Sequence, residues 1–348
     1  MARIVYGVMG DARGHLARSL AVAQELDEHE FLFAGGGVVA ELRDQGREVV
    51  DLPMLGTVLK NGRVHGPATL KNTVAQLARR KRTIAALAER MREFKPGLAI
   101  TDYEYFTPHA ARLAGVPCVS LDNQHLLTHC RVPRPPGQRI NRLATCWSIR
   151  HLFSAADRFL VSSFYQPPAG EGDSAEWFPP ILPHDLEGLA PAPGEYAVVY
   201  MRGASPEDMK QLLRGRKREY RIYGLGEHPA EDNLKFFQAS RQGFIRDLAG
   251  CRYVVSNGGH SLLSEALFLG KPVFALPTAM FYEQYANAYF LAVQKLGGYA
   301  MRPGSRARAL DAFEAGLDVF SAEIRQRDFR GNERITARLR EILERGLA

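Results

Sequence analysis

The segment SNGGHSLLSEALFLGKPVFALP, residues 256–277, is the most informative part of the chain about its fold. It starts at the end of an apolar run, passes through two glycines, continues with apolar residues at helical spacing, and ends in the second apolar run PVFALP. A strand, a glycine turn, a helix and another strand in this order form one unit of a parallel sheet. The two glycines also let a phosphate approach the backbone amides at the start of the helix, where the helix dipole favours anions.

The same alternation continues in both directions along the chain. Before a proline-rich stretch at 177–194, we expect strands at 3–8, 31–36, 48–53, 97–102, 117–122 and 158–163, and helices at 16–26, 38–46, 69–94, 108–115 and 148–157. After it, we expect strands at 196–201, 220–224, 252–257 and 272–277, and helices at 206–214, 243–250 and 261–270. The pattern predicts an α/β protein with two open parallel-sheet domains and helices on both faces of each sheet.

The domain boundaries follow from this alternation and from the prolines. A chain of 348 residues is long enough for two domains. We place an N-terminal domain at 1–180, a proline-rich linker at 181–195 and a C-terminal domain at 196–325. The tail at 326–348 contains an amphipathic helix, which we expect to pack back on the N-terminal domain.

Composition indicates a soluble globular protein, with 46% hydrophobic and 24% charged residues. No run of about 18 apolar residues predicts a spanning helix, and the first 15 residues do not resemble a signal peptide. We therefore expect a cytoplasmic protein. None of the four cysteines forms a C-x-x-C pair, so we interpret them as scattered buried thiols.

The first turn with catalytic potential is GVMGDARGH, residues 7–15. Its glycine spacing differs from G-x-G-x-x-G, which disfavours a dinucleotide site. His15 follows the last glycine at the carboxyl edge of the predicted sheet, where ligands bind in open α/β folds. An imidazole there can act as a general base near neutral pH, and the alternative is a helix-capping or solvated histidine.

Two carboxylates follow the strand at 97–102, in the segment TDYEYF. Asp102 or Glu104 could fix the tautomer of His15 and stabilise its charged form. The alternative for Asp102 is to cap a helix or turn.

Polar residues that suit ribose and sugar hydroxyls follow the glycine turn of residues 256–259. Glu265 lies about two turns into the helix and could accept hydrogen bonds from ribose hydroxyls. Glu283, Gln284 and Asn287 lie in the next loop and suit sugar hydroxyls. Arg202, after the strand at 196–201, is a further candidate cation for an anionic ligand.

Residues 256–288 resemble the donor-binding half of the GT-B glycosyltransferases, and most closely the MurG-like prokaryotic proteins of the family 28 type. The resemblance rests on S-N-G-G-x-S-x-x-S-E-A-L-x-x-G-K-P, E-Q-x-x-N-A, the turn that ends in Gly14-His15, and P-x-x-x-I-T-D-x-E at 96–104. It implies a GT-B fold, in which two Rossmann-like domains face each other across a cleft. It also implies a nucleotide-sugar as co-substrate and no metal or other cofactor.

The resemblance assigns roles to individual residues. His15 would be the base, with Asp102 or Glu104 beside it. Other residues would bind the donor, some at its diphosphate, some at its ribose, some at its sugar and some at its base. Together these donor-binding residues are Gly14, Arg202, Phe244, Ile245, Ser256, Asn257, Gly258, Gly259, His260, Ser261, Glu265, Glu283, Gln284 and Asn287. MurG has a doubled glycine before its histidine, and the plant signature H-C-G-W is replaced here by Asn257–His260. The donor sugar and the acceptor therefore cannot be carried over.

We predict an inverting hexosyl- or N-acetylhexosaminyltransferase that uses a UDP-linked sugar and a hydroxyl acceptor, either lipid-linked or a cell-envelope glycan. Two other hypotheses stay open. One is a UDP-sugar 2-epimerase of the same fold, and the other is a basic protein that binds membranes or nucleic acid without catalysis.

Positive charge is concentrated in residues 60–95, which carry ten basic and two acidic side chains in a chain of net charge +7. Arg79, Arg80, Lys81 and Arg82 could attach the protein peripherally to the inner face of the membrane, since each basic residue near an anionic leaflet contributes about 1 kcal/mol. A solvated helix face is the alternative. Nucleic acid is not expected, because no aromatic residues interleave the charges. We expect no metal at the trio His125, His129 and Cys130.

Overall fold

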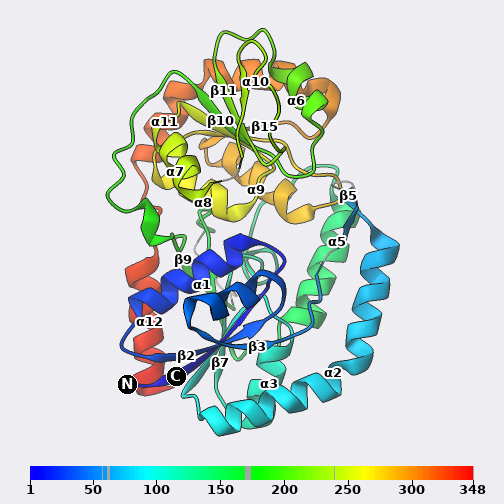
Figure 1. The fold of residues 1–348 in the computed structure, drawn as a ribbon, viewed down its shortest axis with the longest axis vertical. Helices are drawn as coiled ribbons and strands as arrows, with labels where there is room; N and C mark the ends of the chain where they lie inside the picture. The colour runs from blue at the N-terminus through cyan, green and yellow to red at the C-terminus, as the bar shows by residue number, and fades with distance from the viewer. Residues whose placement is uncertain (57, 61–62, 169–173, 239, 348) are drawn as a thin grey trace.

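The computed structural model describes residues 1–56, 58–60, 63–168, 174–238 and 240–347. Two parallel sheets of seven and six strands form two domains that lie one above the other along the long axis (Figure 1). Helices cover both faces of each sheet. The structure therefore confirms the predicted α/β class and its two Rossmann-like domains. Among the described residues, no helix is long and apolar enough to cross a membrane.

The N-terminal sheet has the strand order β3-β2-β1-β6-β7-β8-β9, and neighbouring strands are parallel. Val8 at the end of β1 pairs with Asp102 at the end of β6. The turn that follows β1 therefore lies beside Asp102 at the carboxyl edge of the sheet. The strands are β1 (Arg3–Val8), β2 (Glu30–Gly35), β3 (Glu48–Asp51), β6 (Leu98–Asp102), β7 (Cys118–Asp122), β8 (Arg158–Ser162) and β9 (Glu176–Phe178).

Helices pack on the two faces of this sheet in two separate cores. The helices α1 and α12, with the 3-10 helix η1, cover one face, and α2 and α3 cover the other. Residues 38–46, expected as an α-helix, form a 3-10 helix that ends at Gly46 with φ 75°. The helices are α1 (Arg13–Glu25), η1 (Gly37–Gln45), α2 (Gly66–Phe94), α3 (Phe106–Ala114), α4 (Leu126–His129) and α5 (Arg139–Ser148).

Other segments of this domain also differ from the sequence prediction, and β9 and α4 were not predicted. The helix expected at 148–157 begins earlier, because α5 starts at Arg139 and continues into the π-helical turn η2 (Ile149–Phe153). The helical spacing of apolar residues begins at Ile140, just after the prolines. No element was predicted between the strand at 48–53 and the helix at 69–94, and this interval contains the two-residue antiparallel strands β4 (Leu59–Lys60) and β5 (Arg63–Val64) and the start of α2.

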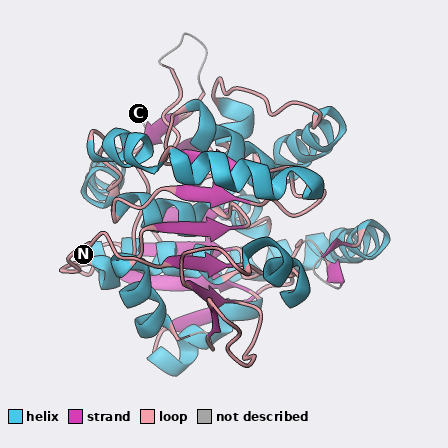
Figure 2. Cartoon of the chain, turned by 90° about the horizontal axis from the view of Figure 1, so that it is seen from above, coloured by secondary structure: helices cyan, strands magenta, loops and turns pink. Residues whose placement is uncertain are grey.

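The C-terminal sheet has the order β12-β11-β10-β13-β14-β15, again with parallel neighbours. Figure 2, which looks down the long axis, shows strands side by side with helices around them. The strands are β10 (Ala197–Tyr200), β11 (Tyr220–Tyr223), β12 (Leu234–Phe236), β13 (Tyr253–Ser256), β14 (Val273–Ala275) and β15 (Gly297–Tyr299). The helical segments are α6 (Pro206–Leu213), α7 (Arg241–Gly250), α8 (His260–Phe268), α9 (Tyr282–Val293), η4 (Pro303–Ser305), α10 (Arg306–Ala315) and α11 (Leu317–Arg325).

The chain crosses between the domains twice. The first crossing contains the short 3-10 helix η3 (His184–Leu186), and the second leads from α11 into α12 (Asn332–Arg345). The helix α12 lies along the N-terminal domain (Figure 1), and its Ile335, Leu339 and Ile342 belong to the same buried cluster as Ile4. The two crossings connect the domains covalently on the left side of Figure 1.

Candidate functional site

The carboxyl edge of the N-terminal sheet holds a cluster of three charged or titratable side chains. His15 and Arg18 lie one turn apart on α1 and both face Asp102 at the end of β6. The Nδ1 atom of His15 is 2.8 Å from Asp102 Oδ1. Arg18 donates from Nε to Oδ2 at 2.9 Å and from Nη2 to Oδ1 at 2.5 Å. The structure therefore joins His15 to Asp102, and it adds a buried arginine that the sequence analysis missed.

Electrostatics within this cluster prepare His15 to accept a proton. Burial favours the neutral form of Asp102, but the charges of Arg18 and His15 outweigh this effect and lower the pKa of Asp102. Burial likewise opposes charge on His15, yet Asp102 outweighs it and raises the pKa of His15 above 6.5. With Nδ1–H donating to Asp102, Nε2 is the ring atom with a free lone pair. The side chain of His15 is 14% exposed, whereas that of Asp102 is fully buried.

Glu104 has a different role from Asp102. Its carboxylate accepts hydrogen bonds from the backbone N–H groups of Phe106 at 2.9 Å and Thr107 at 2.7 Å, and from the Thr107 hydroxyl at 2.6 Å. These contacts cap the N-terminus of α3. Of the two carboxylates that the sequence offered as partners of His15, the structure brings Asp102 to it and uses Glu104 as a helix cap.

Tyr103, between these two carboxylates, has a left-handed backbone conformation with φ 54°. A non-glycine residue in this region is strained, and such residues are frequent at functional sites. Its ring stacks on Phe153 with centroids 4.1 Å apart. The strained backbone turns the chain sharply from Asp102 toward the cap at Glu104, a feature that no sequence signal revealed.

The glycine turn after β13 is held by side chains around it. Ser256 Oγ accepts from the N–H of Gly258 at 3.1 Å, and Asn287 Nδ2 donates to the Gly258 carbonyl at 3.0 Å. Gly258 has φ 87°, and a Cβ there would lie 3.1 Å from the Gln284 carbonyl. Glycine is therefore required at this position. Asn287, predicted to face the donor sugar, is 2% exposed and supports the turn instead.

Two further polar residues of the predicted donor set also hold loops together. Asn257 Oδ1 accepts from the N–H of Arg202 at 2.7 Å, and its Nδ2 donates to Thr278 Oγ1 at 3.3 Å. Gln284 Oε1 accepts from the N–H of Thr278 at 2.8 Å. These bonds fix the loops after β10, β13 and β14 relative to one another. Arg202 itself is exposed at the edge of this arrangement.

The N-termini of α1 and α8 meet where the two domains contact each other. A Cβ on Gly14 would overlap the hydroxyl of Ser261, whereas a Cβ on Gly259 would meet no atom within 4 Å. Two helix N-termini that face the same space present backbone amides and two positive dipole ends. The open side of Gly259 is therefore suited to a diphosphate.

Glu265 of α8 is connected to the linker through an arginine. Arg241 Nη1 donates to Glu265 Oε2 at 2.9 Å, and its Nε and Nη2 atoms each donate to Asp185 at 2.7 Å. Burial raises the pKa of Glu265, and Arg241 opposes that rise. Phe244 and Ile245, expected near the nucleobase, have their side chains in the core of the C-terminal domain. A contribution to base recognition would have to come from their backbone.

Glu283 reaches across the cleft to the N-terminal domain. It accepts from Asn123 Nδ2 and Gln124 Nε2, each at 3.2 Å. Burial raises the pKa of Glu283, and nearby His15 opposes that rise. The side-chain oxygens of Asn123 and Gln124 are buried and have no partner among the described residues. The sequence analysis missed this contact because the partners lie in different domains, although the segment LDNQH at 121–125 is visibly polar after an apolar strand.

His260 lies inside the domain interface. Its ring stacks on Phe164 with centroids 5.7 Å apart, and burial lowers its pKa well below 6.5. Its Nδ1 atom is buried without a hydrogen-bond partner among the described residues. The histidine is therefore neutral and packs between the domains at the start of α8.

The histidines near the end of β7 do not form a metal cluster with Cys130 in the described part of the chain. His125 bonds to Asp122 Oδ2 at 2.7 Å, and His129 stacks on Phe159. The described side chains close enough to share a metal ion are instead Glu25, His184 and Glu187, within 4.8 Å of one another. These three come from α1 and the first crossing between the domains.

Comparisons with known proteins identify the family of the chain and its fold. Residues 2–315 match the family described as Glycosyl transferase family 1. A protein of Methanosarcina acetivorans, named only as an uncharacterized glycosyltransferase, is 25% identical over 326 residues, which cover 85% of this chain and 84% of that protein.

Two solved structures show the same fold over nearly the whole chain. CalG4, the calicheamicin glycosyltransferase, superposes with a TM-score of 0.65 at 17% identity and covers 100% of both chains. MurG of Acinetobacter baumannii superposes with a TM-score of 0.63 at 14% identity and covers 98% of this chain and 100% of its own. At these identities, the superpositions establish the fold and leave donor and acceptor open.

Proposed function

The chain belongs to glycosyl transferase family 1 and is a glycosyltransferase, and from its site we propose that it transfers the sugar of a nucleotide-sugar with inversion at the anomeric carbon. The observation that supports this most strongly is the His15–Asp102 pair beside the meeting point of two helix N-termini. A base and an anion-binding turn on opposite sides of one cleft are the two elements that such a reaction needs.

In the proposed mechanism, Nε2 of His15 takes the proton from the acceptor hydroxyl as its oxygen attacks the anomeric carbon. The bond between that carbon and the diphosphate breaks, and the nucleoside diphosphate leaves with the bonding electron pair. Asp102 stabilises the imidazolium that forms, and Arg18 holds Asp102 in place. The amides at the start of α8 stabilise the charge that develops on the diphosphate. No step needs a metal ion, so we expect a chelator to leave turnover unchanged.

We propose that the C-terminal domain supplies most of the donor contacts and that the N-terminal domain adds Asn123 and Gln124. We propose that Glu265 accepts from the ribose hydroxyls and that Glu283, with Asn123 and Gln124, contacts the sugar. UDP is the nucleotide that we propose, with a hexose or an N-acetylhexosamine attached. The free side-chain oxygens of Asn123 and Gln124 support this reading, because sugar hydroxyls would satisfy them.

The acceptor is proposed to be lipid-linked or a cell-envelope glycan, approached from the N-terminal domain. On α5, Ile140 is 82%, Leu143 51% and Trp147 60% exposed, so an apolar stripe faces solvent. Leu70 and Val74 on α2 are also exposed. An exposed stripe that contains tryptophan is typical of helices that lie in a membrane interface.

Basic residues accompany these apolar stripes. Arg139 and Arg150 are exposed at the ends of α5 and its continuation, and Arg79–Arg82 are exposed on α2. Both helices lie on the right of Figure 1. We propose that this side of the domain attaches to an anionic leaflet at the cytoplasmic face of the membrane.

Membrane attachment is tested by sedimentation with vesicles of phosphatidylglycerol and phosphatidylcholine. We expect binding to anionic vesicles, a blue shift of tryptophan fluorescence, and loss of binding when Arg79, Arg80, Lys81 and Arg82 are changed to glutamine. The matched control changes Arg334, an exposed arginine of α12, to glutamine. Equal sedimentation of both variants would remove this part of the proposal.

The donor site is tested first with a thermal-shift panel of nucleoside diphosphates and nucleotide-sugars. A ligand at 100 times its Kd stabilises by about 2.7 kcal/mol, which raises Tm by several degrees. We expect one nucleotide to raise Tm in the wild type and not in Glu265→Ala.

The catalytic base is tested with His15→Ala. This variant should keep the nucleotide-induced rise in Tm and lose about 10²- to 10⁴-fold in transfer rate. Unchanged transfer by His15→Ala would exclude it as the base, and sugar turnover without any acceptor would indicate an epimerase.

A further inference from the structure

A pocket of about 490 Å³ lies on the C-terminal domain, outside the site described above. Its walls come from four segments, which are the linker at 191–193, Cys251 and Arg252 before β13, the end of α8 with the turn that follows at 267–271, and α11 with the second crossing at 321–329. Both crossings between the domains therefore border it. None of the residues that line it belongs to the His15 cluster or to the glycine turn of residues 256–259.

Lys271 is the unusual residue of this pocket. It is 4% exposed, and its Nζ atom donates to the carbonyl of Ala192 at 2.7 Å. Among the described residues, no carboxylate forms an ion pair with it. Burial lowers its pKa. A buried ammonium group normally has a counter-ion, because removing an unpaired charge from water is costly. The proposed transfer reaction gives this lysine of the G-K-P motif no role.

Other lining residues add positive charge. Arg252 and Arg325 line the pocket with Lys271, and Arg327 follows at the second crossing. Arg252 pairs with Asp318 at 2.5 Å, and Arg327 donates to the Gln294 carbonyl at 3.0 Å. Arg325 makes no hydrogen bond within the described part of the chain. Asp328 is the acidic residue of the lining, so the pocket as a whole favours an anion.

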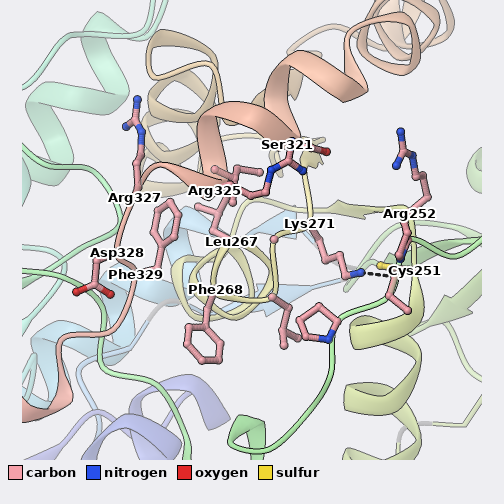
Figure 3. Close-up of a pocket in the computed structure, with 16 residues that line it drawn as sticks. Cys251, Arg252, Leu267, Phe268, Lys271, Ser321, Arg325, Arg327, Asp328 and Phe329 are labelled. Atoms are coloured by element: carbon pink, nitrogen blue, oxygen red, sulfur yellow. Dashed lines mark hydrogen bonds between the residues drawn. The ribbon is translucent and has the colours of Figure 1, made fainter.

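The remaining wall is apolar. Leu267, Phe268 and Phe329 contribute carbon surface. Figure 3 shows the rings of Phe268 and Phe329 on the opposite side from Lys271 and Arg252, with Arg325 between them at the top of the view. A cavity of this volume with an apolar wall and a few convergent polar groups has the character of a small-molecule site.

We propose that this pocket binds a small organic anion whose phosphate or carboxylate group pairs with Lys271 and whose apolar body packs against Phe268 and Phe329. The bound anion would supply the missing counter-ion of Lys271. It would contact both crossings between the domains. This site is independent of the proposed transfer reaction, and its test is a binding measurement.

The experiment uses the full chain and phenyl phosphate as the probe, with titration calorimetry and saturation-transfer NMR. Benzyl alcohol keeps the ring and lacks the charge, whereas inorganic phosphate keeps the charge and lacks the ring. Benzoate keeps the ring and replaces the phosphate with a carboxylate. We expect phenyl phosphate to bind more tightly than inorganic phosphate and far more tightly than benzyl alcohol. Saturation of the donor site with the nucleotide that raises Tm should leave this binding unchanged.

Two variants decide the outcome. Lys271→Met should weaken phenyl phosphate binding about thirtyfold or more, since losing one partner of a buried charge pair typically costs at least that. Arg325→Gln should weaken it several-fold, and the surface control Arg334→Gln should not. If Lys271→Met does not fold, the double variant Arg252→Gln with Arg325→Gln replaces it.

Three results would overturn the proposal. The first is that none of the anionic probes binds. The second is that binding is unchanged in Lys271→Met and in the arginine variants, in which case Lys271 only ties the linker to the domain. The third is that the nucleotide displaces the probe completely, which would place it in the donor site.

Discussion

Gly14 in the first turn of α1 faces Ser261 in the first turn of α8 so closely that a methyl group on Gly14 would overlap the Ser261 hydroxyl. This contact joins the two domains where the donor diphosphate is proposed to bind. A change at Gly14 therefore tests whether close approach of the domains is part of catalysis.

Gly14→Ala should oppose the closed arrangement, because overpacking of this kind costs about 1–3 kcal/mol. We expect kcat/KM for transfer to fall roughly five- to hundredfold, with a small change in Tm, because opening relieves the overlap. Adding Ser261→Gly should restore part of the loss. Gly304→Ala is the control, since a Cβ there meets open space. Wild-type kinetics in Gly14→Ala would show that this contact does not limit the reaction.

Arg18→Met should change the pH dependence of transfer. His15 must be neutral to act as a base, so the rate falls as pH drops through its pKa, which lies above 6.5. Arg18 lowers the pKa of His15, so its removal raises that pKa further. The acid limb of the kcat/KM profile should move to higher pH, with recovery of activity toward pH 9.

The same substitution tests the stability of the cluster. Asp102 has a lowered pKa when folded, so it stabilises the protein at pH values above its usual pKa, and this stability is lost as pH falls. Removing Arg18 from this buried pair should cost about 3–5 kcal/mol in the free energy of unfolding.

Arg18→Lys is the control for the pH dependence of kcat/KM. It keeps the charge and should shift the acid limb of that profile less. A profile in Arg18→Met that coincides with the wild type would show that Arg18 does not act through His15.

Arg241→Met should make donor binding pH-dependent. Glu265 keeps its charge with help from Arg241, which opposes the rise of its pKa. Without Arg241, the pKa of Glu265 rises further and its carboxylate becomes protonated closer to neutral pH. We expect nucleotide affinity, measured by calorimetry from pH 5 to 8, to fall as pH drops, with a midpoint at higher pH than in the wild type.

Asp185→Asn is the matched control for this experiment, because it removes the linker partner and leaves Arg241 bonded to Glu265. Its nucleotide affinity should follow that of the wild type at each pH. If nucleotide affinity changes with pH in the same way in Arg241→Met and in the wild type, Glu265 does not need its charge to bind the ribose.

Glu104→Ala should destabilise the protein and leave the chemistry intact. Loss of a helix cap costs about 0.5–2 kcal/mol, and the three hydrogen bonds of Glu104 place this loss at the start of α3. Chemical denaturation should show the change, and Glu104→Gln should show a smaller one. A hundredfold loss of kcat in a variant that is still folded would return Glu104 to the list of catalytic candidates.

The elements that were predicted correctly are those whose hydrophobic pattern is local. Buried parallel strands such as β6 and β7 are continuous apolar runs, and a glycine turn before an apolar helix marks the start of α8. The carboxyl-edge location of His15 followed from the same pattern. Asp102 lies on the adjacent strand, and the register of Val8 with Asp102 shows why the pair meets.

The direction of a polar side chain could not be predicted in this way. Asn257, Gln284 and Asn287 stand in a motif that suits sugar hydroxyls, yet their side chains satisfy backbone groups of neighbouring loops. Buried backbone groups need such partners, and the sequence does not show which loops lack them. Arg18 was missed because its spacing from His15 indicates only a shared helix face. Glu283 and Gln124 were missed as partners because they are 159 positions apart.

The packing of α12 has a consequence for biosynthesis. Ile335, Leu339 and Ile342 complete the core that contains Ile4, so during synthesis the N-terminal domain lacks one wall until residues 332–345 have emerged from the ribosome. Until then, an apolar face of its sheet and helices is open to chaperones and proteases. A nascent chain that stops before residue 332 would carry every residue of the proposed catalytic site and still lack a complete N-terminal domain.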